Sequence, residues 1–158
     1  MHIIAIDPGY DKCGYSVFIK EDDPCYVTSG LIKTKSSMPI HKRLQVVYQQ
    51  LEIVVKEHKP KSIAVEKLFF SKNAKTAMGV SQSIGAILLL AANHNLELIE
   101  LTPNQIKEVI CGYGNADKRA VQKMLWLQLN EVVKIKDDDE SDAIACGLAA
   151  CLRNTNLY

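Results

Sequence analysis

The sequence predicts an α/β fold in which a mixed β-sheet is flanked by helices. Short apolar runs bounded by turn residues, such as residues 2–7 and 62–66, predict the strands. Longer segments with apolar residues at helical spacing separate the later strands, as crossovers between parallel strands require. The chain has 158 residues, 47% of them hydrophobic and 23% charged, so residues 1–158 fit one compact domain with a sizeable core.

The first three strands are expected at residues 2–7, about 14–19 and about 25–33. Turn-forming residues lie between them, Pro-Gly at 8–9 and Glu-Asp-Asp-Pro at 21–24. Connections this short join antiparallel neighbours, so the three strands should form a meander.

An amphipathic helix is expected at about 39–58, ending before Pro60, and a fourth strand at 62–66. The apolar residues of this helix are Ile40, Leu44, Val47, Leu51, Val54 and Val55. A long helix at about 73–93 then leads to a fifth strand at 96–101.

Thr102 is a good N-cap and Pro103 a good first residue for the next helix. Two further helices are expected near 117–130 and 140–153. A three-strand antiparallel meander followed by helix, strand, helix, strand and closing helices describes the ribonuclease H-like architecture, in which parallel strands extend the meander.

Four carboxylates are the main candidate functional residues. Asp7 ends the first strand and Glu66 the fourth, while Asp139 and Asp142 open the last helix, three residues apart and therefore on one helical face. Taken singly, each is most simply a turn former or a helix cap. Taken together, they would place like charges at one point of the sheet, and a hard divalent cation such as Mg²⁺ is the usual compensation.

The net charge of +1 hides an excess of basic residues outside this group. With the four acids set aside, 14 acidic residues remain against 19 Lys and Arg. Such an excess is compatible with a nucleic-acid-binding surface, although a solvated helix face explains each lysine equally well. The lysines and arginine near the acids in sequence are Lys67, Lys72, Lys75, Lys107, Lys118, Arg119 and Lys123.

The cysteine pattern and hydropathy exclude other classes. Five cysteines without C-x-x-C spacing predict reduced structural thiols and no zinc site. No run approaches about 18 apolar residues, and the start of the chain lacks the features of a signal peptide. We therefore expect a cytoplasmic protein with no membrane partner.

Several sequence segments together are specific to one family. They are Ile6-Asp7-Pro8-Gly9 with Gly14-Tyr15, Val65 to Phe70, Lys72-Asn73-Ala74, Pro103 to Lys107, Gly112 to Lys118, and Asp139 to Ala145. Over nearly its whole length the chain closely resembles the RuvC family of bacterial Holliday junction resolvases. The resemblance implies a single ribonuclease H-like nuclease domain that cuts symmetric strands of four-way DNA junctions in recombination and repair.

The resemblance also implies the site. In the family the four acids hold two Mg²⁺ ions, for which we expect Mn²⁺ to substitute, and here they match Asp7, Glu66, Asp139 and Asp142. Two metals can activate a water and stabilise the leaving oxygen, so that hydrolysis leaves 5′-phosphate ends.

Lys107 and Lys118 match functional lysines of the family, with expected roles in positioning phosphate and stabilising charge. Phe69 matches an aromatic residue that the family uses against junction bases, although a core Phe after a strand is the alternative. Lys72, Asn73 and Arg119 are expected DNA contacts.

The assembly follows from the substrate. A four-way junction has approximate two-fold symmetry, so a homodimer with two active sites is expected, and the resemblance implies the branch-migration partners RuvA and RuvB. Small residues on the helix at 73–93 would permit close packing against a partner helix, or equally against the protein's own sheet. They are Ala77, Gly79, Ser81, Ser83, Gly85 and Ala86.

Three positions depart from the commoner family pattern: Asp11 where a basic residue is frequent, Cys13 for Thr, and Leu101 for an aromatic. They put the details of DNA contact near the first hairpin in doubt. We expect Asp11 to weaken affinity for the DNA backbone, because phosphate contacts dominate binding strength.

Three other functions remain open from the sequence. One is half of an actin-like or sugar-kinase ATPase, which needs a second domain. Another is a nuclease of the same fold acting on RNA or on other DNA structures. The third is a junction-binding module without catalysis, against which the four intact acids argue.

Overall fold

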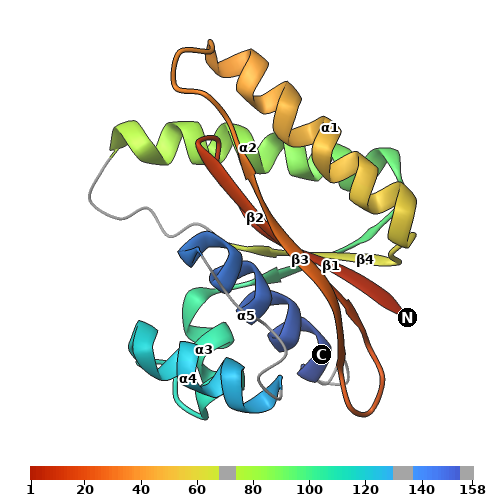
Figure 1. Ribbon diagram of the computed structural model, residues 1–158, viewed down its shortest axis with the longest axis vertical. Helices are drawn as coiled ribbons and strands as arrows, with labels where there is room; N and C mark the ends of the chain where they lie inside the picture. The colour runs from red at the N-terminus through yellow and green to blue at the C-terminus, as the bar shows by residue number, and fades with distance from the viewer. Residues whose placement is uncertain (68–73, 130–136, 154–158) are drawn as a thin grey trace.

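The computed structural model describes residues 1–67, 74–129 and 137–153 (Figure 1). Among these residues, five strands form one sheet in the order β3-β2-β1-β4-β5. The strands are β1 (His2–Asp7), β2 (Lys12–Ile19), β3 (Cys25–Lys33), β4 (Ser62–Glu66) and β5 (Glu97–Leu101). Strands β1, β2 and β3 pair antiparallel, whereas β4 pairs parallel with both β1 and β5. This confirms the predicted mixed sheet.

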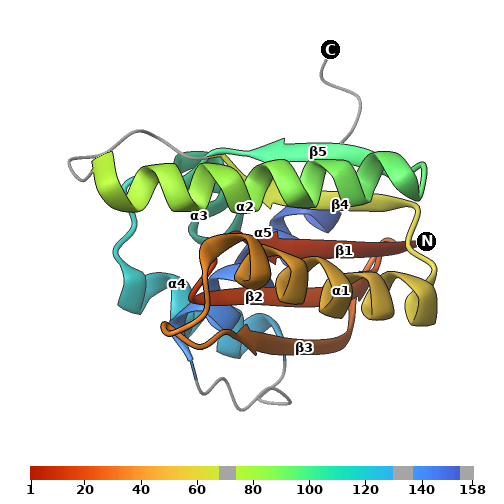
Figure 2. The same ribbon diagram turned by 90° about the horizontal axis from the view of Figure 1, so that it is seen from above.

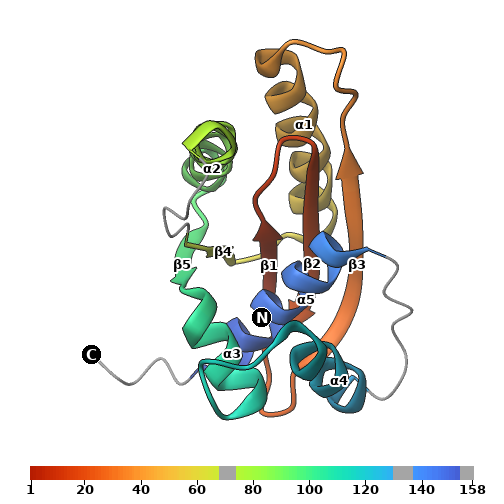
Figure 3. The same ribbon diagram turned by 90° about the vertical axis from the view of Figure 1, so that its left-hand side faces the viewer.

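Helices cover both faces of the sheet. They are α1 (Ile40–His58), α2 (Ala74–Asn93), α3 (Pro103–Cys111), α4 (Lys118–Gln128) and α5 (Asp138–Leu152). Figure 3 shows α1 and α2 on one side of the sheet and α3, α4 and α5 on the other. In Figure 2, α1 and α2 lie in front of the strands, which run in the order of the sheet.

The alternation of side chains along β1 decides on which face Asp7 lies. Ile4 and Ile6 are fully buried against α1 and α2, while Ile3 and Ala5 are fully buried in the core that α5 shares. Because side chains alternate with period two, Asp7 follows Ile3 and Ala5 onto the α5 face. Each fully buried aliphatic side chain stabilises this framework by about 1.5–3 kcal/mol.

Small residues let α5 pack closely on β2. The hydroxyl of Ser16 is buried and donates to the carbonyl of Ala143, at 2.8 Å. A Cβ at Gly147 would stand 2.6 Å from Ser16 Oγ and 2.7 Å from the ring of Phe18, so any larger residue would push the helix away from the sheet. The start of α5 is thereby fixed against β1 and β2.

Helix and strand ends follow the predictions with two instructive differences. Thr102 caps α3 in a reciprocal capping box with Gln105, and Pro103 is the first helical residue, as predicted. However, β2 begins at Lys12 and not near residue 14, because Lys12 pairs with Lys33 in the ladder. The last helix begins at Asp138 and not at residue 140, because Asp137 is its N-cap.

Within the described ranges, we find no helix with both the length and the hydropathy needed to span a bilayer.

Candidate active site

Two neighbouring parallel strands bring Asp7 and Glu66 to the same edge of the sheet. The ladder pairs Ile6 with Val65, so the next residue of each strand is an acid. Alternation places Glu66 on the same face as the buried Ala64, which is the face that α5 covers. The two carboxylates therefore lie side by side at the carboxyl ends of β1 and β4.

Helix α5 adds the other two acids above this point. Asp7 lies opposite Gly14 in the ladder between β1 and β2, and a Cβ at Gly14 would overlap the main-chain carbonyl of Asp139. The absence of a side chain at Gly14 lets the first turn of α5 approach Asp7. Asp142 follows Asp139 by three residues and projects from the same side of the helix.

The pKa of Asp7 reflects both its burial and the charges of the other three acids. Burial raises the pKa of Asp7 from its usual 3.8 to about 8, and the neighbouring charges of Asp142, Glu66 and Asp139 add to the effect. Lys118 opposes this rise. The structure thus brings all four predicted carboxylates into one electrostatic cluster in which their mutual repulsion is only partly offset.

The pKa values of the other three acids are raised as well. Burial is the main cause of the raised pKa of Glu66, followed by the charge of Asp142, while Lys107 and Lys118 act in the opposite direction. Burial likewise raises the pKa of Asp142. For Asp139, burial and a hydrogen bond with Asp137 are the leading causes of a raised pKa.

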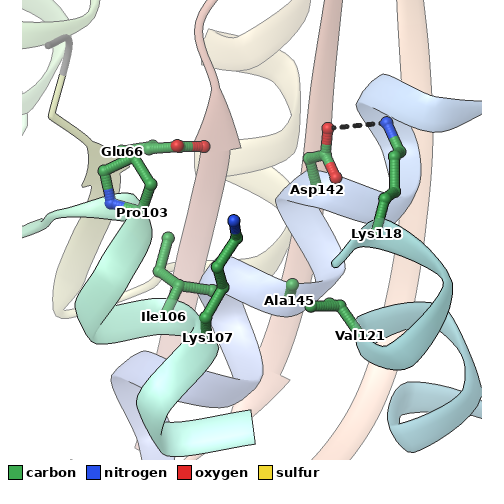
Figure 4. A pocket seen from close by; sticks show the side chains of 8 residues that line it. All are labelled: Glu66, Pro103, Ile106, Lys107, Lys118, Val121, Asp142 and Ala145. Carbon is green, nitrogen blue, oxygen red and sulfur yellow. Dashed lines mark hydrogen bonds and ion pairs between the residues drawn. The ribbon is translucent and has the colours of Figure 1, made fainter. Parts of the chain in front are cut away.

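A pocket of about 280 Å³ lies between β4, α3, α4 and α5 (Figure 4). Glu66 and Asp142 point into it from opposite sides, and the ammonium group of Lys107 reaches up between them. Apolar side chains such as Ile106 and Val121 line part of the pocket, and a surrounding of low dielectric constant strengthens charge interactions. The lining residues are Glu66, Pro103, Ile106, Lys107, Lys118, Val121, Asp142 and Ala145.

Lys118 is one of the cations that partly balance the acids. Its ammonium lies 3.2 Å from Asp142 Oδ2 and 3.3 Å from Asp138 Oδ2. Burial lowers the pKa of Lys118, but Asp142 and Asp138 outweigh this and raise it overall. Lys118 therefore stays charged at the mouth of the pocket.

The donor chemistry fits a hard divalent cation. The four acids supply only carboxylate oxygens, which Mg²⁺ prefers, and their raised pKa values mark a place where added positive charge is stabilising. In the described part of the chain, no three metal-ligating side chains stand close enough in this conformation to enclose one ion. A metal held by three of these acids would require their side chains to rotate toward one another.

Of the four predicted DNA contacts besides the two pocket lysines, the structure describes one. Arg119 is exposed in the first turn of α4, directly after Lys118. Phe69, Lys72 and Asn73 lie outside the described residues.

All five cysteines are free thiols, as predicted. Cys13, Cys146 and Cys151 are buried, and burial raises the pKa of the Cys13 thiol to about 12.

The positions that depart from the commoner family pattern have structural roles. Leu101 and Cys13 are fully buried core residues. The carboxylate of Asp11 pairs with the buried guanidinium of Arg43, which also donates to Thr34 Oγ1 and lies over the ring of Tyr10. The charge of Asp11 is thus already compensated within the protein.

Sequence reasoning missed Lys12. Its ammonium donates to Asp137 Oδ2 at 2.9 Å and lies 3.9 Å from Asp139 Oδ2. The contact joins residues 125 positions apart, so only the sheet register and the packing of α5 reveal it.

Two of the small residues of α2 pack within the protein's own fold. Gly79 packs against the ring of Tyr10, and Ser83 Oγ donates to the carbonyl of Gly9, so both serve the protein's own fold. Ser81 and Gly85 are instead exposed.

Known proteins match the chain along most of its length. The family described as "Crossover junction endodeoxyribonuclease RuvC" matches residues 3–151. The protein of that name from Thermosipho melanesiensis is 44% identical over 153 residues, which are 96% of each chain. The one from Natranaerobius thermophilus is 43% identical over 94% of this chain and 92% of its own.

The fold agrees with a solved structure of the same family. Thermus thermophilus RuvC in complex with a Holliday junction substrate superposes with a TM-score of 0.87 at 26% identity, covering 94% of this chain and 92% of that one. A family match over residues 3–151, relatives above 40% identity and a shared fold agree with one another. The chain belongs to the RuvC family of crossover junction endodeoxyribonucleases.

Proposed function

We propose that this protein resolves four-way DNA junctions by metal-dependent hydrolysis of phosphodiester bonds, in homologous recombination and DNA repair. The observation that carries the proposal is the gathering of Asp7, Glu66, Asp139 and Asp142 beside a pocket lined by two lysines. A family relative, Thermus thermophilus RuvC, has a solved complex with a Holliday junction substrate. Residues 1–158 are proposed to form one nuclease domain.

The four acids are the proposed ligands of two Mg²⁺ ions, with Mn²⁺ as a substitute. Bound there, the metals supply an activated water and charge neutralisation at the leaving oxygen. The attacking water oxygen forms the new bond to phosphorus while the bond to the 3′ oxygen breaks. The products carry a 5′-phosphate and a 3′-hydroxyl group.

The lysines act on the scissile phosphate in this proposal. Lys107 already projects into the pocket between Glu66 and Asp142, where a phosphate oxygen would meet its ammonium group. Lys118 contacts Asp142 in this structure, and with a metal bound to that acid its ammonium would be available to the phosphate. Both place positive charge where negative charge grows during phosphoryl transfer.

The DNA surface extends from the pocket. Arg119 is exposed next to Lys118 and is a proposed contact to the DNA backbone. Phe69, Lys72 and Asn73 remain proposed contacts on sequence grounds, with Phe69 stacking on an unpaired base.

We propose a homodimer that joins through the exposed stripe of α2. Met78, Leu88 and Leu89 are 68%, 37% and 57% exposed, and they recur with Gly85 at helical spacing. Leu98 of the neighbouring edge strand is 41% exposed on the same side of the sheet. A second copy is the natural occupant, because the junction is two-fold symmetric and both its cuts need an active site.

RuvA and RuvB are the proposed branch-migration partners, and the cytoplasm is the proposed location. Both proposals rest on family membership. Membership of a nuclease family also argues against half of an ATPase.

The test is cleavage of a labelled four-way junction with a mobile, sequence-diverse core. The purified protein is incubated with Mg²⁺ or with chelator, and a linear duplex and an RNA duplex serve as controls. Paired, symmetric nicks that need metal and spare both duplexes are the expected result. Binding without cutting would favour a non-catalytic module, and indiscriminate cutting would favour another nuclease activity on the same fold.

A further inference from the structure

The start of α5 carries more acids than a metal site needs. Five acids lie within six residues, and only two of them are proposed ligands. The five are Asp137, Asp138, Asp139, Glu140 and Asp142. A divalent cation in this region could bind carboxylates that are not proposed ligands. Other contacts in the protein must therefore determine which carboxylates are available to the metal.

Each acid that is not a proposed ligand is engaged by another side chain. Glu140 Oε1 accepts a hydrogen bond from Ser29 of β3, at 2.6 Å. Asp138 is bound by Lys118 at 3.3 Å and by Gln122 at 3.4 Å.

Asp137 is the acid that could most readily compete with Asp139 for a metal ion. Its carboxylate accepts from the main-chain N–H of Asp139 at 3.4 Å, as the N-cap of α5. The same carboxylate accepts from Lys12 at 2.9 Å and lies 4.0 Å from the ammonium of Lys33. It is therefore turned toward the β2 and β3 side of the helix start.

Lys12 lies between the two carboxylates. Besides its hydrogen bond to Asp137, it is 3.9 Å from Asp139 Oδ2. Lys12 therefore pairs closely with Asp137 and more distantly with Asp139.

The position of Lys12 in the sheet explains why it can do this. Lys12 opens β2, two residues before Gly14, where the backbone of Asp139 packs directly on the strand. Its side chain spans from the strand to the helix start, so it ties Asp137 to the rigid sheet.

We propose that Lys12 is a positioning residue that holds Asp137 in its capping role and away from the metals, so that Asp139 is the ligand from this turn. The proposal rests on the proposed metal-dependent function. It differs from a simple phosphate contact by Lys12, which would affect DNA affinity and not the choice of metal ligand.

The test uses Lys12→Met, Lys12→Arg and the double variant Lys12→Met/Asp137→Asn. Lys35→Met, which removes one exposed lysine just beyond β3, is the matched control. Binding of Mn²⁺ to the free protein is measured by calorimetry, and junction cleavage is measured in single turnover at saturating Mn²⁺. Junction affinity is measured over a range of salt concentrations without metal.

Lys12→Met should bind Mn²⁺ as tightly as wild type or more tightly, because a nearby positive charge is lost. Its cleavage at saturating metal should be slower by on the order of tenfold, because Asp137 then displaces Asp139 from its productive geometry. Lys12→Arg should retain cleavage. The double variant Lys12→Met/Asp137→Asn should recover the cleavage that Lys12→Met loses, because Asn caps the helix without competing for metal. Lys35→Met should match wild type.

Unchanged cleavage in Lys12→Met would overturn the proposal, as would weaker Mn²⁺ binding or failure of Asp137→Asn to restore cleavage. A reduced dependence of junction affinity on salt, without restoration, would reassign Lys12 to phosphate binding. If wild type itself bound Mn²⁺ but cut no junction, the proposed function would fail instead, and the Mn²⁺ measurements would still compare the variants.

Discussion

The α-carbon of Gly14 lies against the main-chain carbonyl of Asp139, with no room for a side chain between them. Gly14 also lies opposite Asp7 in the sheet. A single glycine therefore sets the distance between the strand that supplies one proposed metal ligand and the helix that supplies two others.

Gly14→Ala should damage cleavage more than folding. Forcing a methyl group into this contact costs about 1–3 kcal/mol of the free energy of unfolding. Because Asp139 would move relative to Asp7, the cleavage rate should fall on the order of 10²-fold. Urea unfolding and single-turnover cleavage of a four-way junction measure the two effects. Cleavage at the wild-type rate would show that the spacing is not critical.

Lys107→Ala should slow cleavage more than it weakens junction binding. Its ammonium projects into the pocket and stabilises charge that grows in the transition state, so the rate should fall about 10²-fold. Lys123→Ala removes an exposed lysine of α4 and is the control. Comparing single-turnover rates with binding curves checks the prediction. Equal losses in rate and affinity would reassign Lys107 to anchoring the DNA backbone.

The stability of the metal-free protein should fall as pH rises from about 4 to about 8. Below this window Asp7 is protonated in both the folded and the unfolded chain. Within it the unfolded chain releases the proton while the folded protein keeps it, because the folded pKa is about 8. Above this pH window, Asp7 is ionised in both states and its destabilising contribution no longer changes with pH.

Asp7→Asn should remove much of this pH dependence and raise the metal-free stability near pH 8, while adding Mg²⁺ should stabilise only the wild type. Urea unfolding at several pH values, with and without Mg²⁺, measures both effects. Parallel pH profiles for the two proteins would argue against the elevated pKa of Asp7.

Leu89→Glu should convert the proposed dimer into monomers. A charge in the middle of the exposed α2 stripe would have to be buried on association, which is costly without a partner. Ile53→Glu places the same charge on an exposed position of α1, where Ile53 is 55% exposed, and should leave the dimer intact. Sedimentation equilibrium distinguishes the outcomes. Loss of the dimer in both variants, or in neither, would place the interface elsewhere.

Asp11→Asn should leave junction affinity nearly unchanged and lower stability. The sequence alone predicts that Asp11 weakens DNA binding, but in the structure its carboxylate already pairs with Arg43. Removing it leaves a largely buried guanidinium without its charge partner, which is destabilising. Binding curves and thermal unfolding test this. Clearly tighter junction binding would restore the original expectation.

Much of this architecture was predictable because local patterns determine it. The end of β1 at Asp7 and of β4 at Glu66 follows from apolar runs, and the capping box of Thr102 follows from residue preferences. The start of α5 was misplaced by two residues, because any of several consecutive acids could cap a helix. Sequence offers no rule for choosing Asp137 among them.

The remaining features depend on contacts between distant segments. Lys12 acquires its role only when β2 and α5 pack together, and Gly14 acquires its role only through its register with Asp7. Arg43 similarly compensates Asp11 from a different element. Such contacts can be recognised only in the folded structure, because no periodicity or spacing in the sequence indicates them.

The most direct test of the central claim compares Asp7→Asn and Glu66→Gln with wild type for both binding and cutting of a four-way junction. Each variant loses a proposed metal ligand and one negative charge near the DNA. Both variants should bind the junction about as well as wild type and should not cut it in Mg²⁺. Cutting at a near wild-type rate by either variant would contradict the assignment of these carboxylates as metal ligands.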